Sequence, residues 1–336
     1  MDKFSRITII FITVLLAADM VTAVYAIFKG PFPVTVPLGT PIAYRNIYLH
    51  VPIAVSTYLL FAGAALTGLL YMIKGGSSVL RYLDAFITVG LFFAVATLLS
   101  GILWASESWG APWNWDPKET AVLLLAIAYA AYHPLKTSIA DPERRGRIAA
   151  AYALAAFTMV PMSYAASNLF QSLHPTGEAV SEFSAGGIGG LLLLTRVAII
   201  PLLALTLALT AGRGESADWR IAAIYAIAGL AVAAYALTLC GGDRVLEVVT
   251  SEDGMISSMI VSTGRTYTFN PPVMNPIDPP LTEDGVSTLI NHIVRVDDGR
   301  ILVSLHWSTP LNLVIHVTAI SLSLALAWRG VGRVED

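Results

Sequence analysis

The residues best suited to chemistry in this chain form one short aromatic segment. Residues 104–120 read WASESWGAPWNWDPKET and lie between two strongly apolar runs. Indole rings have an apolar body and a polar N–H, so many membrane proteins place one or two tryptophans at the headgroup level. Three tryptophans within seven residues (Trp109, Trp113 and Trp115), interleaved with Gly, Pro and Asn, exceed that pattern. They predict a flat aromatic surface on a turn-rich backbone, suited to lying against a planar apolar ligand.

The pattern W-G-x-x-W-x-W-D-P-K-E-T, which begins at Trp109 and Gly110, resembles the tryptophan-rich WWD motif of the haem-handling protein superfamily. That superfamily comprises cytochrome c maturation proteins C and F and the CcsA/ResC-type cytochrome c synthetase subunits. Residues 45–52 read RNIYLHVP and resemble the R-x-x-Y-x-H-V-P segment of maturation protein C. The SLHP sequence at 172–175 stands where the family has its second external histidine. The resemblance covers about residues 40–210 and implies that the planar ligand is haem b.

Two histidines flank the aromatic segment, His50 before it and His174 after it. A single histidine near a membrane interface is most often a hydrogen-bonded amphipathic side chain. Two neutral imidazoles beside an aromatic surface, however, are what a haem iron with two axial histidine ligands requires. The resemblance assigns both residues that role, as the family's external iron ligands.

Charged residues around the motif have separate expected roles. Arg45 lies on the predicted outer side, and its guanidinium fork suits a haem propionate. Lys118 is a second propionate candidate, although a lysine beside an apolar run commonly extends to the interface. Asp116 and Glu119 begin the next helix, where N-capping and the helix dipole rigidify the end of the segment. The resemblance also places Gly110 and Asp116 in the cofactor-binding motif.

The composition of the chain is that of an integral membrane protein. Of its 336 residues, 56% are hydrophobic and only 13% are charged. The net charge of −3 and the lack of a basic patch with interleaved aromatics exclude a nucleic-acid-binding footprint. The single cysteine, Cys240, excludes an intramolecular disulfide and a C-x-x-C redox pair. The sequence has no G-x-x-x-x-G-K-[ST] loop, so energy from ATP would come from a partner, such as an ABC-type maturation subunit.

Apolar runs of membrane-spanning length predict an all-α polytopic protein with about eight transmembrane helices. The runs cover residues 7–28, 48–73, 84–104, 119–139, 148–168, 188–211, 219–240 and 310–329. Arg196 lies inside one of these runs. A charge at that depth either serves function or pairs with a buried acid, for which Asp19 and Asp84 are available.

The distribution of Lys and Arg predicts how these helices are oriented in the plasma membrane. Basic residues gather at the N-terminal end and in segments 74–81, 136–147, 213–220 and 329–333, which are therefore expected to be cytoplasmic. The aromatic segment, His50 and His174 then all fall on the extracytoplasmic side. Both termini are predicted to lie in the cytoplasm.

A segment with a different pattern interrupts the helical runs near the end of the chain. Residues 241–308 alternate between apolar and polar residues and contain Gly and Pro punctuation, which predicts a small β-rich extracytoplasmic domain. It would lie between a transmembrane core of residues 1–240 and a final helix and tail of residues 309–336. This domain would dock a haem acceptor or cover the exposed haem edge. The four remaining histidines, whose relation to haem the sequence leaves open, are His133, His292, His306 and His316.

Together these features predict a membrane protein that binds haem b at its extracytoplasmic face and presents it to a haem chaperone or an apocytochrome c. In this hypothesis the tryptophans form a wall of the porphyrin site, the histidines ligate the iron, and Arg45 holds a propionate. One alternative is a synthetase (haem lyase) subunit that catalyses thioether formation between haem vinyl groups and a cytochrome C-x-x-C-H motif. Another is a haem-free transporter or scaffold whose tryptophans only anchor it in the membrane.

Overall fold

The protein is mainly helical, with one small sheet near its C-terminal end. The computed structural model describes residues 3–33, 36, 39–174, 187–214, 219–251, 253–277 and 289–329. The helices are α1 (Lys3–Lys29), η1 (Pro41–Asn46, a 3-10 helix), α2 (Ile47–Lys74), α3 (Ser77–Ser108), α4 (Pro117–Ala130), α5 (Tyr132–Thr137), α6 (Pro142–Phe157), α7 (Met159–Leu169), α9 (Gly187–Arg213), α10 (Trp219–Thr238) and α11 (Ser308–Arg329). The predicted tail after residue 329, and residues 252 and 278–288 of the predicted β-rich segment, lie outside the described residues.

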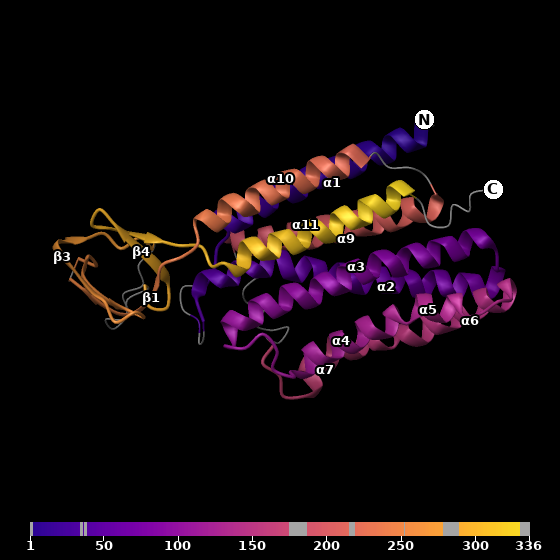
Figure 1. Cartoon of the computed structure of the whole chain (residues 1–336), viewed down its shortest axis with the longest axis horizontal. Helices are drawn as coiled ribbons and strands as arrows, with labels where there is room; N and C mark the ends of the chain where they lie inside the picture. Colours follow the sequence, from indigo (N-terminus) through magenta and orange to yellow (C-terminus); the bar gives the residue numbers. More distant parts are fainter. Residues whose placement is uncertain are drawn as a thin grey trace.

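The long helices run along one common axis and form layers (Figure 1). The antiparallel pair α2 and α3 lies in the middle, with α9 and α11 on one side and α4 to α7 on the other. Gly75 and Gly76 connect the central pair with φ angles of 62° and 95°, a conformation that glycine adopts without steric penalty. This central pair therefore contacts both neighbouring layers.

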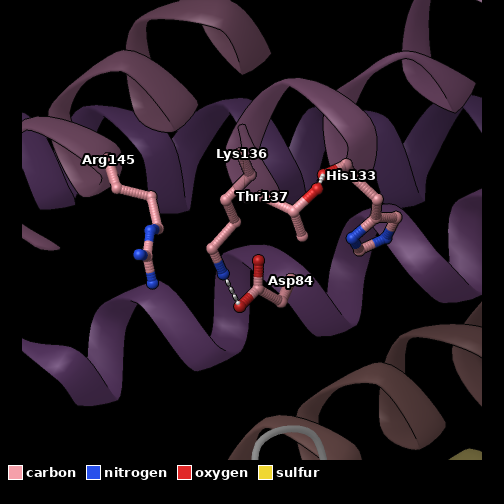
Figure 2. Close-up of a pocket in the computed structure, with 5 residues that line it drawn as sticks. All are labelled: Asp84, His133, Lys136, Thr137 and Arg145. Atoms are coloured by element: carbon pink, nitrogen blue, oxygen red, sulfur yellow. Dashed lines mark hydrogen bonds and ion pairs between the residues drawn. The ribbon is translucent and has the colours of Figure 1, made fainter. Parts of the chain in front are cut away.

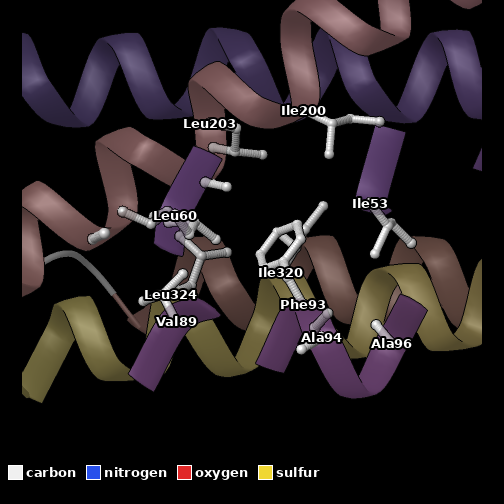
Figure 3. Close-up of a cluster of buried hydrophobic side chains, with 14 of the residues drawn as sticks. Ile53, Leu60, Val89, Phe93, Ala94, Ala96, Ile200, Leu203, Ile320 and Leu324 are labelled. Atoms are coloured by element: carbon white, nitrogen blue, oxygen red, sulfur yellow. The ribbon is translucent and has the colours of Figure 1, made fainter. Parts of the chain in front are cut away.

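The centre of the core is formed by apolar side chains from α2, α3, α9 and α11 (Figure 3). Those that are at most 1% exposed include Ile53, Leu60, Val89, Phe93, Ile200, Leu203, Ile320 and Leu324. The outer layer is joined to this core through Phe61 on α2 and Tyr129 on α4, whose rings stack at 3.6 Å. The outer layer and the central pair of helices are thus packed directly against each other.

Seven helical segments among the described residues are long and apolar enough to cross a membrane, which confirms a multi-pass membrane protein. They are α1, η1 with α2, α3, α6 with α7, α9, α10 and α11. The remaining predicted run, residues 119–139, instead forms two short helices, α4 and α5, of 14 and 6 residues. They meet at Ala131. Pro134 explains the division, because it has no N–H to donate to the carbonyl group four residues earlier. The two helices still follow one another along the bundle (Figure 1).

The two ends of the bundle carry different groups. The α2–α3 turn, the α5–α6 turn, the end of α9 and the start of α10 share one end (Figure 1). The basic residues of these segments are Lys74, Arg81, Lys136, Arg144, Arg145, Arg147, Arg213 and Arg220. The aromatic segment and the sheet lie at the opposite end (Figure 1). The separation that the sequence predicted between basic segments and the aromatic segment is therefore present in the fold.

The predicted β-rich segment is a five-stranded antiparallel sheet that extends beyond the ends of α10 and α11 (Figure 1). Its strands are β1 (Asp243–Thr250), β2 (Ile256–Val261), β3 (Thr266–Val273), β4 (Ile293–Asp297) and β5 (Arg300–Val303), in the order β3-β2-β1-β4-β5. Val245, Met259, Val294 and Ile301 contribute to one small buried cluster. The sheet therefore has a hydrophobic core of its own.

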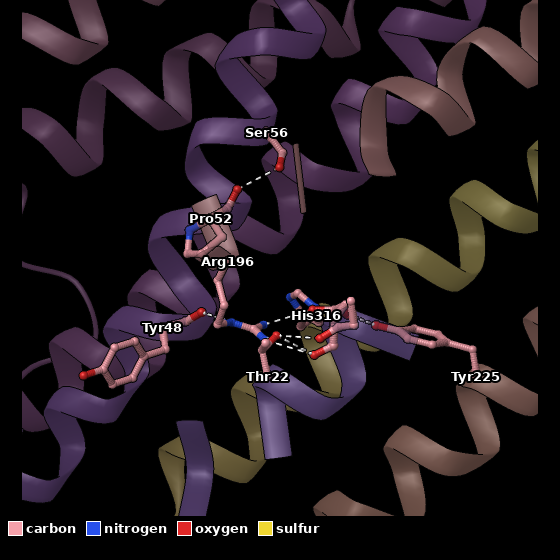
Figure 4. Close-up of polar contacts among 9 residues, drawn as sticks. Thr22, Tyr48, Pro52, Ser56, Arg196, Tyr225 and His316 are labelled. Carbon is pink, nitrogen blue, oxygen red and sulfur yellow. Dashed lines mark hydrogen bonds and ion pairs between the residues drawn. The ribbon is translucent and has the colours of Figure 1, made fainter. Parts of the chain in front are cut away.

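A fully buried ionic cluster joins α1, α9, α10 and α11 (Figure 4). The carboxylate of Asp19 lies 3.1 Å from the guanidinium of Arg196 and 2.9 Å from Nε2 of His316. It also accepts a hydrogen bond from the hydroxyl of Tyr225. Arg196 therefore pairs with Asp19, one of the two acids that the sequence offered, and His316 faces the bundle interior.

Arg196 also holds the first turns of α2 through Tyr48 (Figure 4). His50 lies in the same turns of the helix. Pro52 has no N–H for the carbonyl oxygen of Tyr48, one turn earlier in the helix. Arg196 Nε donates to that oxygen at 2.6 Å, while its NH1 donates to the carbonyl oxygen of Asp19 at 3.1 Å. The start of α2 is thereby tied to both α1 and α9.

Candidate functional site

The aromatic segment turns sharply between the end of α3 and the start of α4. Gly110 has a φ of 75°, and Trp115 has a φ of 55°, a left-handed conformation that residues with a Cβ rarely adopt. The rings of Trp113 and Trp115 are nearly perpendicular, at 87° with centroids 5.8 Å apart, and Trp115 is 74% exposed. The turn-rich backbone is as predicted, whereas Trp113 and Trp115 do not form the predicted flat surface, because their rings pack edge to face.

His50 and His174 line the same cavity, although 124 positions separate them in the sequence. The cavity has a volume of about 70 Å³ and lies among α2, α3, the aromatic segment and the start of α4. Its other lining residues are Ala54, Tyr58, Thr97, Leu98, Gly101, Ile102, Trp113, Lys118, Glu119 and Val122. The fold therefore unites the two predicted ligands with one predicted tryptophan and one predicted propionate partner.

The ring of His50 is fixed by contacts with α3. Its Nδ1 lies 2.7 Å from the hydroxyl of Ser100, and its ring packs edge-on against Trp104 at 5.8 Å. Gly101 makes this approach feasible, because a Cβ there would lie 3.3 Å from His50 Cε1. With Nδ1 engaged, Nε2 is the nitrogen available to a ligand in the cavity.

His174 is fixed by a carboxylate. Its Nδ1 lies 2.9 Å from Asp116 Oδ1, and its ring packs against Trp109 with centroids 4.8 Å apart. Asp116 Oδ2 additionally accepts from the hydroxyl of Ser172 and from the backbone N–H of Leu173, at 2.7 and 2.6 Å. The carboxylate therefore orients the imidazole and the short segment that carries it.

The electrostatics of this pair favour a neutral imidazole beside a charged carboxylate. Burial lowers the pKa of His174 from its ordinary value of 6.5, and the neighbouring Asp116 offsets only part of this effect. Burial alone would raise the pKa of Asp116, but the hydrogen bonds from Ser172 and Leu173 outweigh it and lower that pKa. At neutral pH, His174 Nε2 therefore carries a lone pair that is free to ligate a metal.

The predicted N-capping role of Asp116 is confirmed. Its Oδ1 accepts from the backbone N–H groups of Lys118 and Glu119 at 2.8 and 3.4 Å, at the start of α4. Glu119 reaches back to accept from the backbone N–H of Asn114 at 3.1 Å. One side chain, Asp116, thus both caps a helix and orients His174.

The two candidate propionate partners lie in different places. Lys118 lines the cavity, and its Nζ donates to the carbonyl oxygen of Tyr164 at 3.2 Å. Arg45 is buried outside the cavity lining, where its Nε and NH1 donate to the carbonyl oxygens of Gly30 and Ile27 at 2.7 and 2.8 Å. These contacts satisfy carbonyl groups at the end of α1. A propionate role for Arg45 stays a prediction, and Lys118 is the better placed of the two.

The donor set fits the haem that the resemblance implies. Histidines that bind metals usually present one ring nitrogen to the metal and hold the other with a carboxylate, carbonyl or similar partner. In both His50 and His174 one ring nitrogen, Nδ1, is held in this way, by a hydroxyl and by a carboxylate respectively. A cavity of about 70 Å³ is well below the roughly 300 Å³ at which pockets enclose small molecules. Porphyrin binding therefore requires the cavity to widen around the two histidines.

A second cavity, of about 370 Å³, lies at the basic end of the bundle (Figure 2). His133 lines it together with Asp84, Lys136, Thr137 and Arg145. Lys136 forms an ion pair with Asp84, and His133 Nε2 lies 3.0 Å from the hydroxyl of Thr88. His133 is therefore remote from the His50 and His174 cavity.

Three polar residues near the site were assigned no role from the sequence motifs: Asn46, Glu107 and His306. Glu107, two residues before Trp109, accepts from buried His306 at 2.9 Å, and Asn46 lies one turn before His50. His306 lies in the segment predicted to be β-rich, and it contacts the end of α3. Only the placement of an acid inside the aromatic segment could have indicated Glu107.

Comparison with known proteins supports the resemblance drawn from the motif. A family described as Cytochrome C assembly protein matches residues 1–174, slightly more than half of the chain. Relatives called cytochrome c biogenesis protein CcsA are 42% identical over 93 residues in Thermosynechococcus vestitus and 37% over 99 in Atropa belladonna. These matches cover 26% and 29% of this chain and 28% and 31% of the relatives.

The CcsA protein of Arabidopsis thaliana is 38% identical over 97 residues, which are 29% of each chain. The chain thus matches less than a third of the length of these curated relatives. The family match, by contrast, contains the aromatic segment and extends from the N-terminus through His50 to His174. This chain therefore belongs to the cytochrome c assembly protein family.

Proposed function

We propose that this protein binds haem b between His50 and His174 and presents it to a haem chaperone or an apocytochrome c during cytochrome c biogenesis. The observation that carries this proposal is the pair of imidazoles on one cavity, each with Nδ1 held by a neighbouring group. The family membership and the CcsA relatives support the same process.

Each residue of the site has a defined part in this proposal. His50 and His174 would ligate the iron through Nε2, and Ser100 and Asp116 would keep their rings in the ligating orientation. Lys118 places an ammonium group at the cavity for a propionate. Haem supplies the vinyl groups that become attached to a cytochrome. Trp113 excludes water from one side of the cavity, and exposed Trp115 leaves an aromatic face open to a partner.

We place this site on the extracytoplasmic side of the plasma membrane. The basic residues gather at the opposite end of the bundle (Figure 1), and cytoplasmic loops carry the excess of Lys and Arg in membrane proteins. Attachment of haem outside the cytoplasm requires the site to face that side. ABC-type or other maturation subunits are candidate partners, because the sequence has no nucleotide-binding loop.

Expression with an apocytochrome c, in cells that lack other maturation proteins, tests the proposal. We expect the purified protein to carry haem that acid–organic solvent extracts, and the apocytochrome to remain without covalent haem. Covalent haem on the cytochrome C-x-x-C-H motif would instead establish the synthetase activity. A protein that stays colourless after haem supplementation contradicts both activities and supports the scaffold hypothesis.

We expect Asp116→Asn to weaken haem binding by about 10- to 100-fold, the usual effect of losing a carboxylate that orients a metal-binding histidine. Asparagine is as good an N-cap as aspartate, so α4 remains intact. The measurement is a haem titration followed by absorbance, with circular dichroism as the check on folding. An unchanged affinity would show that the carboxylate does not orient the ligand.

The pH dependence of the wild type follows from the same contact. Because the pKa of His174 is lowered, the neutral imidazole is favoured in the folded protein. Its contribution to haem binding is therefore lost only as pH falls through that lowered pKa. The low-spin haem signal should therefore persist below pH 6.5, the ordinary value for histidine, and disappear on further acidification. Loss of the signal at or above pH 6.5 would contradict the neutral, buried His174.

A further inference from the structure

A continuous set of polar contacts joins the sheet and α11 to the segments that carry the candidate haem site. One end of this set is Glu107, on the last turn of α3 and two residues before Trp109. Its carboxylate accepts from Arg244 of β1 and from His306, each at 2.9 Å, and from the hydroxyl of Thr40. Groups from three separate segments therefore converge on one residue inside the aromatic segment.

The same contacts continue from His306 to the start of α2. His306 Nδ1 lies 2.7 Å from the hydroxyl of Ser308, which accepts from Asn46 Nδ2 at 2.7 Å. Asn312 Nδ2 in turn donates to Asn46 Oδ1 at 2.9 Å. Asn46, Ser308 and Asn312 are completely buried and His306 is 1% exposed, so water does not compete for these contacts.

One face of α11 supplies the partners. Ser308, Asn312 and His316 are spaced by four residues, which aligns them along one side of a helix. Ser308 and Asn312 hold Asn46, the residue that precedes α2, and His50 follows one turn later. His316 contacts Asp19, and Asp19 forms an ion pair with Arg196. Arg196 in turn donates to the carbonyl oxygen of Tyr48 on α2. The turn of α2 that carries His50 is therefore held through both contacts.

We propose that Glu107, His306 and Asn46 are positioning residues that set the place of Trp109 relative to His50. Through them the sheet and α11, which lie beyond the family match at residues 1–174, become part of the site. A buried hydrogen bond to a charged group restrains both partners strongly, because leaving either one unsatisfied is unfavourable. The expected effect on the properties of bound haem rests on the proposed function. The expected effect on the segments that carry Trp109 and His50 does not.

The test measures backbone amide exchange in the haem-free protein and the midpoint potential of the haem-loaded protein. Glu107→Gln removes the charge while keeping the size of the side chain. Arg244→Gln removes one partner of the Glu107 carboxylate, and the side chain of Arg244 is partly exposed. This variant replaces Glu107→Gln in the test if that protein does not accumulate. Glu143→Gln is the matched control, because Glu143 forms an exposed ion pair with Arg147 at the other end of the bundle.

We expect exchange in residues 104–116 to accelerate by about tenfold in the Glu107→Gln variant, with α6 unchanged. The midpoint potential of bound haem should shift in this variant and not in the Glu143→Gln control. Equal exchange in both variants, or acceleration spread over every helix, would overturn the positioning role. A wild type that binds no haem contradicts the proposed function alone, because the exchange measurement needs no haem.

Discussion

Replacement of His50 or His174 by alanine is expected to abolish the low-spin haem signal of the purified protein. Each substitution removes an iron ligand, so the loss of affinity should exceed the roughly 10- to 100-fold effect of removing a group that only orients a ligand. The measurement is the absorption spectrum in mild detergent after haem titration.

Imidazole provides the control for this prediction. Each alanine leaves space that free imidazole can occupy, so millimolar imidazole should restore the low-spin spectrum of either single variant. His133→Ala should keep the signal of this site, because His133 lies at the opposite end of the bundle. A spectrum that is insensitive to both His50→Ala and His174→Ala would place haem elsewhere in the protein.

The largest loss of stability is expected from removing one member of the buried ionic cluster. Asp19→Leu leaves the guanidinium of Arg196 buried without its carboxylate, and both groups are 0% exposed. Breaking such a pair typically costs about 3–5 kcal/mol. The measurement is denaturant unfolding in detergent, followed by circular dichroism.

The double variant Asp19→Leu/Arg196→Met separates the buried charge from the lost contacts. With no charge left unpaired, it should be more stable than either single variant, although the carbonyl oxygen of Tyr48 loses a donor. Glu143→Gln should change the free energy of unfolding by less than about 1 kcal/mol, because its ion pair with Arg147 is exposed. Equal stability of Asp19→Leu and wild type would contradict a structural role for the cluster.

The sequence predicted much of the fold because membrane helices are defined by length and composition alone. Seven of the predicted runs correspond to helical segments long enough to cross a membrane, and the alternating segment at 241–308 contains the sheet. The prediction of a single helix over residues 119–139 was wrong, because the segment forms α4 and α5. A count of apolar residues does not include the effect of Pro134 on the helix. The distribution of Lys and Arg predicted that His50 and His174 lie on the same side of the membrane, and the structure brings both to one cavity.

The details of the site depended on contacts that no local pattern encodes. Asp116 was expected to cap α4, but its bond to His174 joins positions 58 residues apart. Glu107 contacts His306, and Asn46 contacts Ser308 at the start of α11. In each pair the two residues are more than 190 positions apart in the sequence. Arg45 has the right chemistry for a propionate, yet it donates to carbonyl groups at the end of α1.

The polar face of α11 completes contacts with residues that are synthesised much earlier in the chain. Asp19 and Asn46 are synthesised long before Ser308, Asn312 and His316, so each enters the membrane without its later partner. Until α11 inserts, the amide of Asn46 lacks both of its partners on that helix, whereas the carboxylate of Asp19 already has Arg196 and Tyr225. A buried amide without partners is unfavourable. A chain whose synthesis stops before α11 would therefore leave Asn46 unsatisfied, and the start of α2 beside His50 would lose the contacts that Ser308 and Asn312 provide.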